Sequence, residues 1–433
     1  MNARAALMDA FETASTFAPP RAIRATISRY SLSAGGPMTI SAAHFIASLI
    51  FLHTLAPAQF GLFSFLLIVV PFSLSITGSL LGPSLMAELR RTTRIEEATL
   101  ATHLKANLVI AALAAAIVAA LMYESGAGST PALLLGLYGG AMALRGFGRS
   151  YAYAVKWPLR VFLSDIVYSA VLISGLLLLL TTDRLTMASA AMVLAIAAIF
   201  SMAAFGAAYL AKLVRPGNAG SIWAYGAIWQ EWARWAVFGV VLTELTANAH
   251  AYLVTFISGP KAFAVLALGS LLMRPASLVL SALPDIERPR MAAKIGKDDI
   301  TGAFRTVKEF RTAAVAIWIA TILLAGVLLM WFPHTILRKG YDETQALIVL
   351  AFWVVILGVR TLRTPEAVFL QAAGEFRALA RVSMWSSVTS LAVTLALLLI
   401  AGPIFSLAGL VAGDVVMTGN IFALTRNWKR VHG

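Results

Sequence analysis

The stretch Ala56–Phe65 reads APAQFGLFSF, and the stretch Gly259–Leu268 reads GPKAFAVLAL. Each stretch leaves one long apolar segment and enters another. Each has proline as its second residue and phenylalanine as its fifth, and both matched pairs are 203 residues apart. Two turns with the same pattern at corresponding places indicate an internal duplication of the chain.

Prolines in the apolar segments after these turns repeat as well. Pro71 and Pro275 are 204 residues apart, and Pro83 and Pro284 are 201 residues apart. The near-constant offset supports two halves of similar layout. Duplicated six-helix halves with a site between them are a recurring architecture of secondary transporters.

The composition is that of a membrane protein. Hydrophobic residues make up 60% of the 433 residues, and charged residues make up only 12%. A helix needs about 20 apolar residues to cross a bilayer core of about 30 Å. The sequence predicts an all-α polytopic protein with about 12 transmembrane helices in two parallel six-helix repeats around a central cavity. The predicted spans are 31–55, 61–86, 107–123, 131–148, 161–181, 187–210, 235–258, 262–283, 312–332, 344–363, 378–401 and 403–425.

The distribution of positive charge predicts the topology. With the N-terminus in the cytosol, the inside segments hold 29 of the 34 Lys and Arg residues, and the outside loops hold four. Cytoplasmic loops of membrane proteins carry such an excess. We therefore expect both termini in the cytosol. The net charge of +14 is then explained by topology and anionic membrane lipids rather than by nucleic acid.

These spans divide the chain into five parts. We expect a cytosolic lead-in over 1–30, a six-helix lobe over 31–210, a cytosolic amphipathic linker over 211–234, a second six-helix lobe over 235–425 and a cytosolic tail over 426–433. In the linker, the spacing of Tyr225, Trp229 and Trp232 predicts one aromatic helix face at the level of the lipid headgroups.

The sequence lacks the residues that several classes of protein need for their function. The chain has no Cys, which excludes disulfides and thiolate metal sites. It has no Walker A sequence for ATP and no His-rich metal spacing, and its outside loops are too short for a catalytic domain. We expect no enzymatic activity, no cofactor and no metal. Transport is then driven by an ion gradient, by the gradient of the substrate or by a partner.

Charged residues inside spans are expensive and by default indicate a functional site. Arg274 lies in the middle of the eighth span, directly before Pro275, and a proline kink could turn its guanidinium into the cavity. We expect it to bind substrate. The alternative is a structural ion pair, for example with Glu244.

Two arginine pairs lie near the ends of the fourth and tenth spans. Arg145 and Arg149 are one turn apart, and Arg360 and Arg363 are arranged similarly. Snorkelling anchors at the cytosolic interface are one interpretation. An anion funnel that binds substrate is the other.

Acidic residues in the spans allow ion coupling. Glu244 and Asn248 share one face of the seventh span, where a proton or sodium site and a structural hydrogen-bonded pair are both possible. Asp165 and Asp414 lie nearer the ends of their spans, and structural roles are expected for them.

His44 and His53 lie nine residues apart in the first span, on opposite helix faces, so they cannot share one ligand. At least one of them is expected to be a packing histidine with satisfied hydrogen bonds.

The N-terminal pattern resembles the O-antigen and exopolysaccharide flippases of the multidrug/oligosaccharidyl-lipid/polysaccharide export superfamily. The residues that carry it are the first span, its exit Leu55–Ser64, which is similar to a Pro-x-x-Phe-Gly turn, and the basic stretch Glu88–Arg91 after the second span. Lys339–Asp342 adds a turn similar to Gly-x-Tyr, but no residue separates its Gly from its Tyr. The resemblance implies two six-helix lobes, alternating access and a cargo of polyprenyl diphosphate-linked oligosaccharide.

The expected partners are this lipid-linked cargo, membrane lipids, and a polysaccharide polymerase or export protein. Flipping is physically demanding, because sugar hydroxyls and a diphosphate are costly to place in lipid without partners. One alternative is a drug/cation antiporter of the same superfamily. A membrane-embedded glycan polymerase or transferase is the other, although no catalytic loop is visible.

Overall fold

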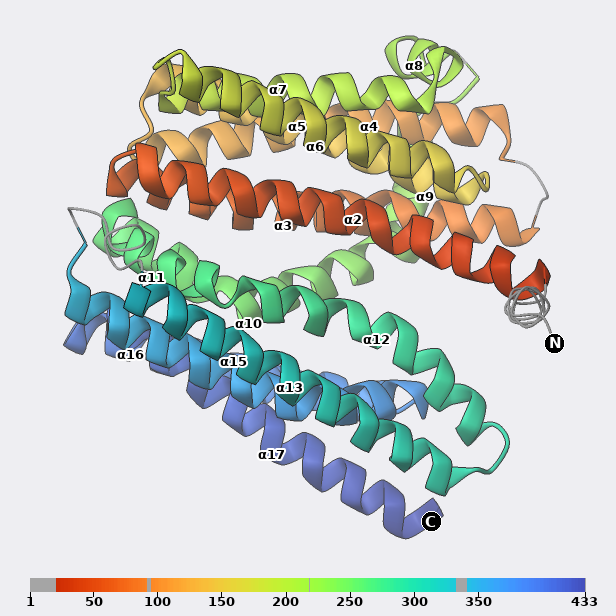
Figure 1. Cartoon of the computed structure of the whole chain (residues 1–433). Coiled ribbons are helices and arrows are strands. Elements are labelled where there is room, and N and C mark those ends of the chain that lie inside the picture. Colours follow the sequence, from red (N-terminus) through yellow and green to blue (C-terminus); the bar gives the residue numbers. More distant parts are fainter. Residues whose placement is uncertain (1–20, 92–94, 218, 332–340, 433) are drawn as a thin grey trace, which may run out of the picture.

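The computed structural model describes residues 21–91, 95–217, 219–331 and 341–432. Every regular element in these ranges is a helix, and the helices form two lobes (Figure 1). Helix α2 begins at Arg21, inside the predicted lead-in of 1–30, and its candidate membrane span begins at Gly35. Residues 1–20 of that lead-in, and most of the loop before α15, lie outside the described residues.

The N-terminal lobe contains the first six spans. Its helices are α2 (Arg21–Thr54), α3 (Pro57–Arg91), α4 (Glu97–Glu124), α5 (Ser129–Ala154), α6 (Pro158–Thr181) and α7 (Met187–Ser201). The predicted sixth span, 187–210, is interrupted: a 3-10 turn, η1 (Met202–Phe205), follows α7, and α8 (Ala207–Val214) begins after Gly206. Gly206 has φ +93, a conformation that glycine adopts without strain.

The linker between the lobes is helical but is not one regular amphipathic helix. It contains η2 (Ile222–Ala224), α9 (Tyr225–Ile228) and the π-helical turn η3 (Trp229–Ala233). The hydroxyl of Tyr225 donates to the carbonyl oxygen of Leu80 in the N-terminal lobe at 2.9 Å. Whether Tyr225 shares an aromatic face with Trp229 and Trp232 stays a prediction. Burial raises the pKa of Tyr225 to about 12, so this donor keeps its proton. Trp229 is 43% exposed.

The C-terminal lobe contains the other six spans. Its helices are α10 (Arg234–Ser258), α11 (Pro260–Leu272), α12 (Arg274–Ile295), α13 (Ile300–Trp331), α15 (Glu343–Ala372), α16 (Phe376–Ala401) and α17 (Leu407–His432), with a 3-10 turn, η4 (Ile404–Ser406), before α17.

The predicted spans coincide with these helices. In the described residues, nine helices are long and apolar enough to cross a membrane, or up to 11 spans if each of two bent pairs is counted as one. The bent pairs are the two parts of α10, at 67°, and α11 with α12, at 62°. Helix α5 fills the remaining predicted span and is less apolar, because it contains several glycines and two arginines.

Small residues allow close packing inside each lobe. A Cβ at Gly413 in α17 would lie 2.6 Å from the Cβ of Ser390 in α16, and a Cβ at Gly136 in α5 would lie 2.7 Å from that of Ala119 in α4. In lipid, helices associate through such close contacts, because the hydrophobic effect contributes little between apolar surfaces. Each lobe is therefore a tightly packed unit that can move as a body.

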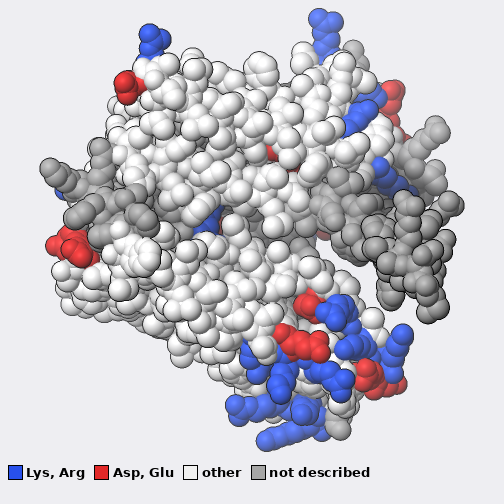
Figure 2. All heavy atoms as spheres, in the orientation of Figure 1, with Lys and Arg blue, Asp and Glu red and all other residues white. Residues whose placement is uncertain are grey.

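The lobes meet at one end and separate at the other. At the end away from the termini, α3 contacts α11 and α10, and the ribbons diverge toward the end where both termini lie (Figure 1). Figure 2 shows the surface hollowed between the lobes, with Lys and Arg side chains gathered over the free end of the C-terminal lobe. The surface between the lobes is thus hollowed on one side, and the lobes are in contact where α3 meets α10 and α11.

Candidate functional site

The two arginines of the first pair bind the same buried carboxylate. Arg145 and Arg149 of α5 both bind Oδ1 of Asp165 in α6. Arg145 also donates from Nε to the hydroxyl of Ser164 at 3.1 Å. Asp165 is completely buried and Arg145 is 2% exposed. Because two guanidinium groups share one carboxylate, this cluster keeps one net positive charge inside the N-terminal lobe.

A chain of aromatic hydroxyls supports this cluster. The guanidinium of Arg145 lies 5.1 Å from the ring centre of Tyr168, a cation–π distance. The hydroxyl of Tyr168 contacts Nε2 of His44 at 2.8 Å and the hydroxyl of Tyr138 at 2.9 Å. These contacts connect α5 and α6 to α2, so the arginine pair is held in a network that spans three helices.

The second arginine pair repeats this arrangement in the C-terminal lobe. Arg360 donates from Nε to Oδ2 of Asp414 at 2.7 Å, and Arg363 donates from Nη1 to Oδ1 at 2.7 Å. The carboxylate comes from α17, the twelfth span, rather than from the fifth helix of its lobe. Arg360 is 30% exposed and Arg363 is 14% exposed, so this pair is more accessible than Arg145.

Arg274 lies at the break between α11 and α12. The preceding Met273 ends α11, and Pro275 occupies the first turn of α12, where its missing N–H costs nothing. Within the described part of the chain, no carboxylate pairs with Arg274. Helix α12, which Arg274 begins, contacts α2 of the N-terminal lobe. The bend therefore places this cation at the start of a helix that reaches the N-terminal lobe.

Glu244 lies in α10 beside two polar groups. Tyr252 donates its hydroxyl to Oε1 of Glu244 at 3.0 Å, and the side chain of Asn248 also bonds to the carboxylate. The predicted shared face of Glu244 and Asn248 is confirmed. The suggested ion pair with Arg274 is wrong, since Glu244 forms hydrogen bonds with uncharged partners and appears in no ion pair with a described residue.

The snorkelling interpretation of the arginine pairs is corrected in part. Arg145 is turned into the lobe toward Asp165 and is almost completely buried. Arg149, Arg360 and Arg363 likewise bind a carboxylate. Asp165 and Asp414, expected to be structural, are the residues that hold the arginines. Whether the same arginines bind substrate stays a prediction.

Other residues around this region carry no signal in the sequence. Tyr168 lies three residues after Asp165, and Tyr252 lies eight after Glu244, but a tyrosine in an apolar helix is common. Arg311 of α13 binds Glu366 of α15, a pair separated by 55 residues along the chain. Among the described residues, no group of three His, Cys, Asp or Glu side chains is arranged to hold a metal ion.

Comparison with known proteins gives the fold. No protein-family model and no curated protein matches the sequence. Among solved structures, an inward-facing multidrug resistance MATE family transporter of the MOP superfamily covers 93% of this chain and 98% of its own, with a TM-score of 0.66 and 12% identity. The chain has the fold of these transporters. Lipid II flippase MurJ in an inward closed conformation gives a TM-score of 0.68 at 10% identity, covering 90% of this chain and 86% of its own.

A further solved structure has the same helical fold. An outward-facing structure of a MATE family transporter covers 94% of this chain with a lower TM-score of 0.59 and 12% identity. The predicted fold class, two six-helix lobes around a central cavity, is thereby confirmed. At such identities the likeness concerns the fold, and the cargo has to be argued from the residues of this chain.

Proposed function

We propose that this protein is a flippase of the bacterial inner membrane that moves polyprenyl diphosphate-linked oligosaccharide outward by alternating access. The observation that carries the proposal is the excess of positive charge at one buried arginine and four half-buried ones inside the helical lobes. Two arginine pairs share one aspartate each, and Arg274 has no carboxylate partner among the described residues. An anionic headgroup is the cargo that this charge favours.

Guanidinium groups suit a diphosphate in particular. Arginine binds phosphate oxygens through two parallel N–H donors, which lysine does not offer. Arg274 begins α12 of the C-terminal lobe, which contacts α2. Arg145 of the N-terminal lobe is connected to α2 through Tyr168 and His44. In our proposal, the diphosphate binds between the lobes at Arg274, and Arg145, Arg149, Arg360 and Arg363 supply the surrounding positive field.

The carboxylates have a supporting role in this proposal. Asp165 and Asp414 hold each arginine pair at a fixed position without cancelling its charge. An arginine alone in a span costs at least about 2.5 kcal/mol on insertion scales, and a shared carboxylate lowers that cost while it leaves donors for the cargo. The sugars then pass through the cavity, and the lipid tail stays in the bilayer.

Glu244 and Asn248 are the residues that we propose for ion coupling. A carboxylate in a span that is hydrogen-bonded to Tyr252 can bind a proton or, with the oxygen of Asn248, a sodium ion. The proposed partners of the protein also include membrane lipids and a polysaccharide polymerase or export protein that receives the cargo outside.

One observation favours a second candidate, a drug/cation antiporter. Glu244 lies beside Tyr252 and next to an apolar groove, and an acidic aromatic site of this kind suits an organic cation. The solved neighbours include multidrug resistance transporters. The candidates predict opposite charges on the cargo.

The two functions are separated by transport in the same vesicles. Purified protein is reconstituted into liposomes that contain a polyprenyl diphosphate disaccharide, and a membrane-impermeant lectin reports the sugar that reaches the other leaflet. Parallel vesicles are loaded with ethidium and given a proton or sodium gradient. The proposal predicts movement of the sugar lipid and no gradient-driven ethidium transport. Ethidium transport without sugar-lipid movement would establish the antiporter instead.

A further inference from the structure

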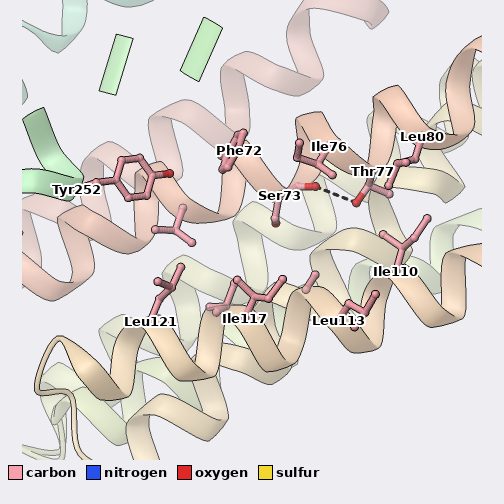
Figure 3. Close-up of a pocket in the computed structure, with 13 residues that line it drawn as sticks. Phe72, Ser73, Ile76, Thr77, Leu80, Ile110, Leu113, Ile117, Leu121 and Tyr252 are labelled. Atoms are coloured by element: carbon pink, nitrogen blue, oxygen red, sulfur yellow. Dashed lines mark hydrogen bonds between the residues drawn. The ribbon is translucent and has the colours of Figure 1, made fainter. Parts of the chain in front are cut away.

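An apolar groove lies beside the seam at which the two lobes meet (Figure 3). Its volume is about 240 Å³. Side chains of α3 and α4 face each other across it, and Tyr252 of α10 closes one end. The groove is therefore built by the N-terminal lobe and completed by one residue of the C-terminal lobe.

The walls of the groove are apolar. Its two hydroxyl-bearing residues on α3 turn their oxygens to their own helix: Ser73 donates to the carbonyl of Val70, and Thr77 donates to that of Ser73, both at 2.8 Å. The pocket presents almost no polar surface as a result. A site whose polar groups are already satisfied offers nothing to a sugar or a phosphate and accepts a hydrocarbon.

The groove has a buried floor and an exposed rim. Its floor contains Ala114 and Val118, which are 7% and 0% exposed, whereas Leu113 and Ile117 on the same helix are both 57% exposed and form the rim. An apolar cavity of about 150 Å³ is large enough to bind benzene, so this groove accepts a larger hydrocarbon fragment. A branched chain that fits between α3 and α4 would contact floor and rim together.

One end of the groove adjoins polar side chains, which indicates that an amphiphile binds there. The hydroxyl of Tyr252 bonds to Glu244, at 3.0 Å, and the ring of Tyr252 packs edge-on against Phe65 of α3, at 5.3 Å between centroids. Phe65 is buried where the lobes touch. The groove thus runs from the lipid-facing side to the seam, beyond which polar residues begin.

We propose that this groove holds the isoprenoid tail of the lipid-linked cargo while its diphosphate head lies between the lobes. The inference rests on the proposed function and adds a second binding region to it. A head that moves between the lobes must stay joined to a tail that remains in the membrane, and the seam of α3 with α10 is where the two regions adjoin.

The groove acts by alignment rather than by hydrophobic burial. Lipid tails are as apolar as the groove, so transfer of the cargo tail from the bilayer gains little. The benefit is that a tail fixed in the groove keeps the attached head beside the lobes, which raises its local concentration there. Ordinary acyl chains lack the methyl branches that an isoprenoid presents to the floor and rim.

Photocrosslinking tests which lipid occupies the groove. Reconstituted protein is exposed to a polyprenyl diphosphate that carries a diazirine in its tail and, separately, to a phospholipid with a diazirine in its acyl chain. We expect the first reagent to label α3 and α4 around Ile76 and Ile117, and unlabelled polyprenyl diphosphate to compete. Equal labelling by the phospholipid, without competition, would show bulk lipid in the groove and overturn the inference.

A filling substitution tests the role. Ile117→Trp occupies the groove, and Leu178→Trp on α6, where Leu178 is 64% exposed, is the matched control that adds the same ring to a lipid-facing position. We expect flipping of the long-tailed sugar lipid to fall about tenfold in Ile117→Trp only. Thermal unfolding of Ile117→Trp in detergent at the Tm of the wild type would show that the variant is folded.

Different results would contradict the proposed tail site and the proposed flippase function. If wild-type protein flips the sugar lipid but the groove is not labelled and Ile117→Trp is fully active, the groove is not the tail site and the flippase assignment stands. If wild-type protein neither binds nor flips the sugar lipid, both are wrong.

Discussion

Gly61 and Ala264 each lie four residues after the repeated proline of their half, and they face each other across the seam between the lobes. A Cβ at Gly61 would lie 3.3 Å from the Cβ of Ala264 and would overlap the carbonyl oxygen of Pro260. The two halves of the duplication thus meet at corresponding positions, and the glycine is what allows the contact. Buried Phe65 packs against Phe256 and Phe263 beside it.

Enlarging Gly61 is expected to open this end of the cavity. In Gly61→Leu the side chain cannot fit against Pro260, so the closed seam is disfavoured. The chain has no Cys, so a cysteine introduced at Phe65 is its only thiol. We expect a membrane-impermeant maleimide to label this thiol faster in Gly61→Leu than in the parent.

The control for this experiment is Gly78→Leu on the same helix, because nothing lies within 4 Å of a Cβ at Gly78. It should label as slowly as the parent. Equal labelling of all three proteins would mean that the contact at Gly61 does not hold the seam closed.

Asp165→Asn is expected to destabilise the N-terminal lobe. Removal of one partner of a buried ion pair costs about 3–5 kcal/mol, because the other charge is left uncompensated, and here two guanidinium groups lose their carboxylate. Thermal unfolding in detergent should show a clear decrease in Tm. Asp183→Asn, at an exposed turn, should leave Tm unchanged. A normal Tm for Asp165→Asn would show that the cluster contributes little to stability.

Glu244→Gln is expected to separate transport from the ion gradient. The amide keeps the size of the side chain and its acceptor for Tyr252, but it cannot bind a proton or hold a sodium ion as a carboxylate does. Vesicles with and without an imposed gradient should then give the same rate in the variant. Gradient dependence equal to that of wild type would make Glu244 a structural residue.

The topology is tested by reporter fusions. Alkaline phosphatase, active only outside, should be inactive after Arg215, Lys297 or Arg426 and active when placed within 124–130 or 333–343. The reason is the 29-to-4 distribution of Lys and Arg between the two sides. A reproducible inversion at one of these positions would contradict the parallel arrangement of the two halves.

Local patterns predicted the fold well. The spans, the duplication and the bend at Arg274 follow from apolar length and from prolines, which act on their own neighbours in the chain. The corresponding Pro71 leaves α3 continuous, however. A proline shows where a bend is possible, and packing decides whether it occurs.

Contacts between helices could not be predicted from one sequence. Arg363 and Asp414 are 51 residues apart, and their pairing depends on which helices are neighbours in the lobe. Helical spacing shows that Arg145 and Arg149 share a face but not that this face meets Asp165. For this reason the arginines were ambiguous between membrane anchors and a buried site, and only the fold shows them bound to carboxylates.

Arg274 provides the most direct test of the central claim, which is that the cavity carries an anionic lipid head. A hydrogen bond to a charged group contributes about 1.5–3 kcal/mol, and each 1.4 kcal/mol is tenfold. Lysine keeps the charge but loses the paired donors, and alanine loses both. Arg184→Ala, at an exposed loop position, is the control.

The measurement is the rate at which reconstituted Arg274 variants flip a polyprenyl diphosphate disaccharide, read beside the amount of folded protein in the vesicles. The account predicts a graded loss, with Arg274→Lys partly active and Arg274→Ala at least about tenfold slower, both at normal abundance. Full activity of a normally abundant Arg274→Ala protein would contradict it.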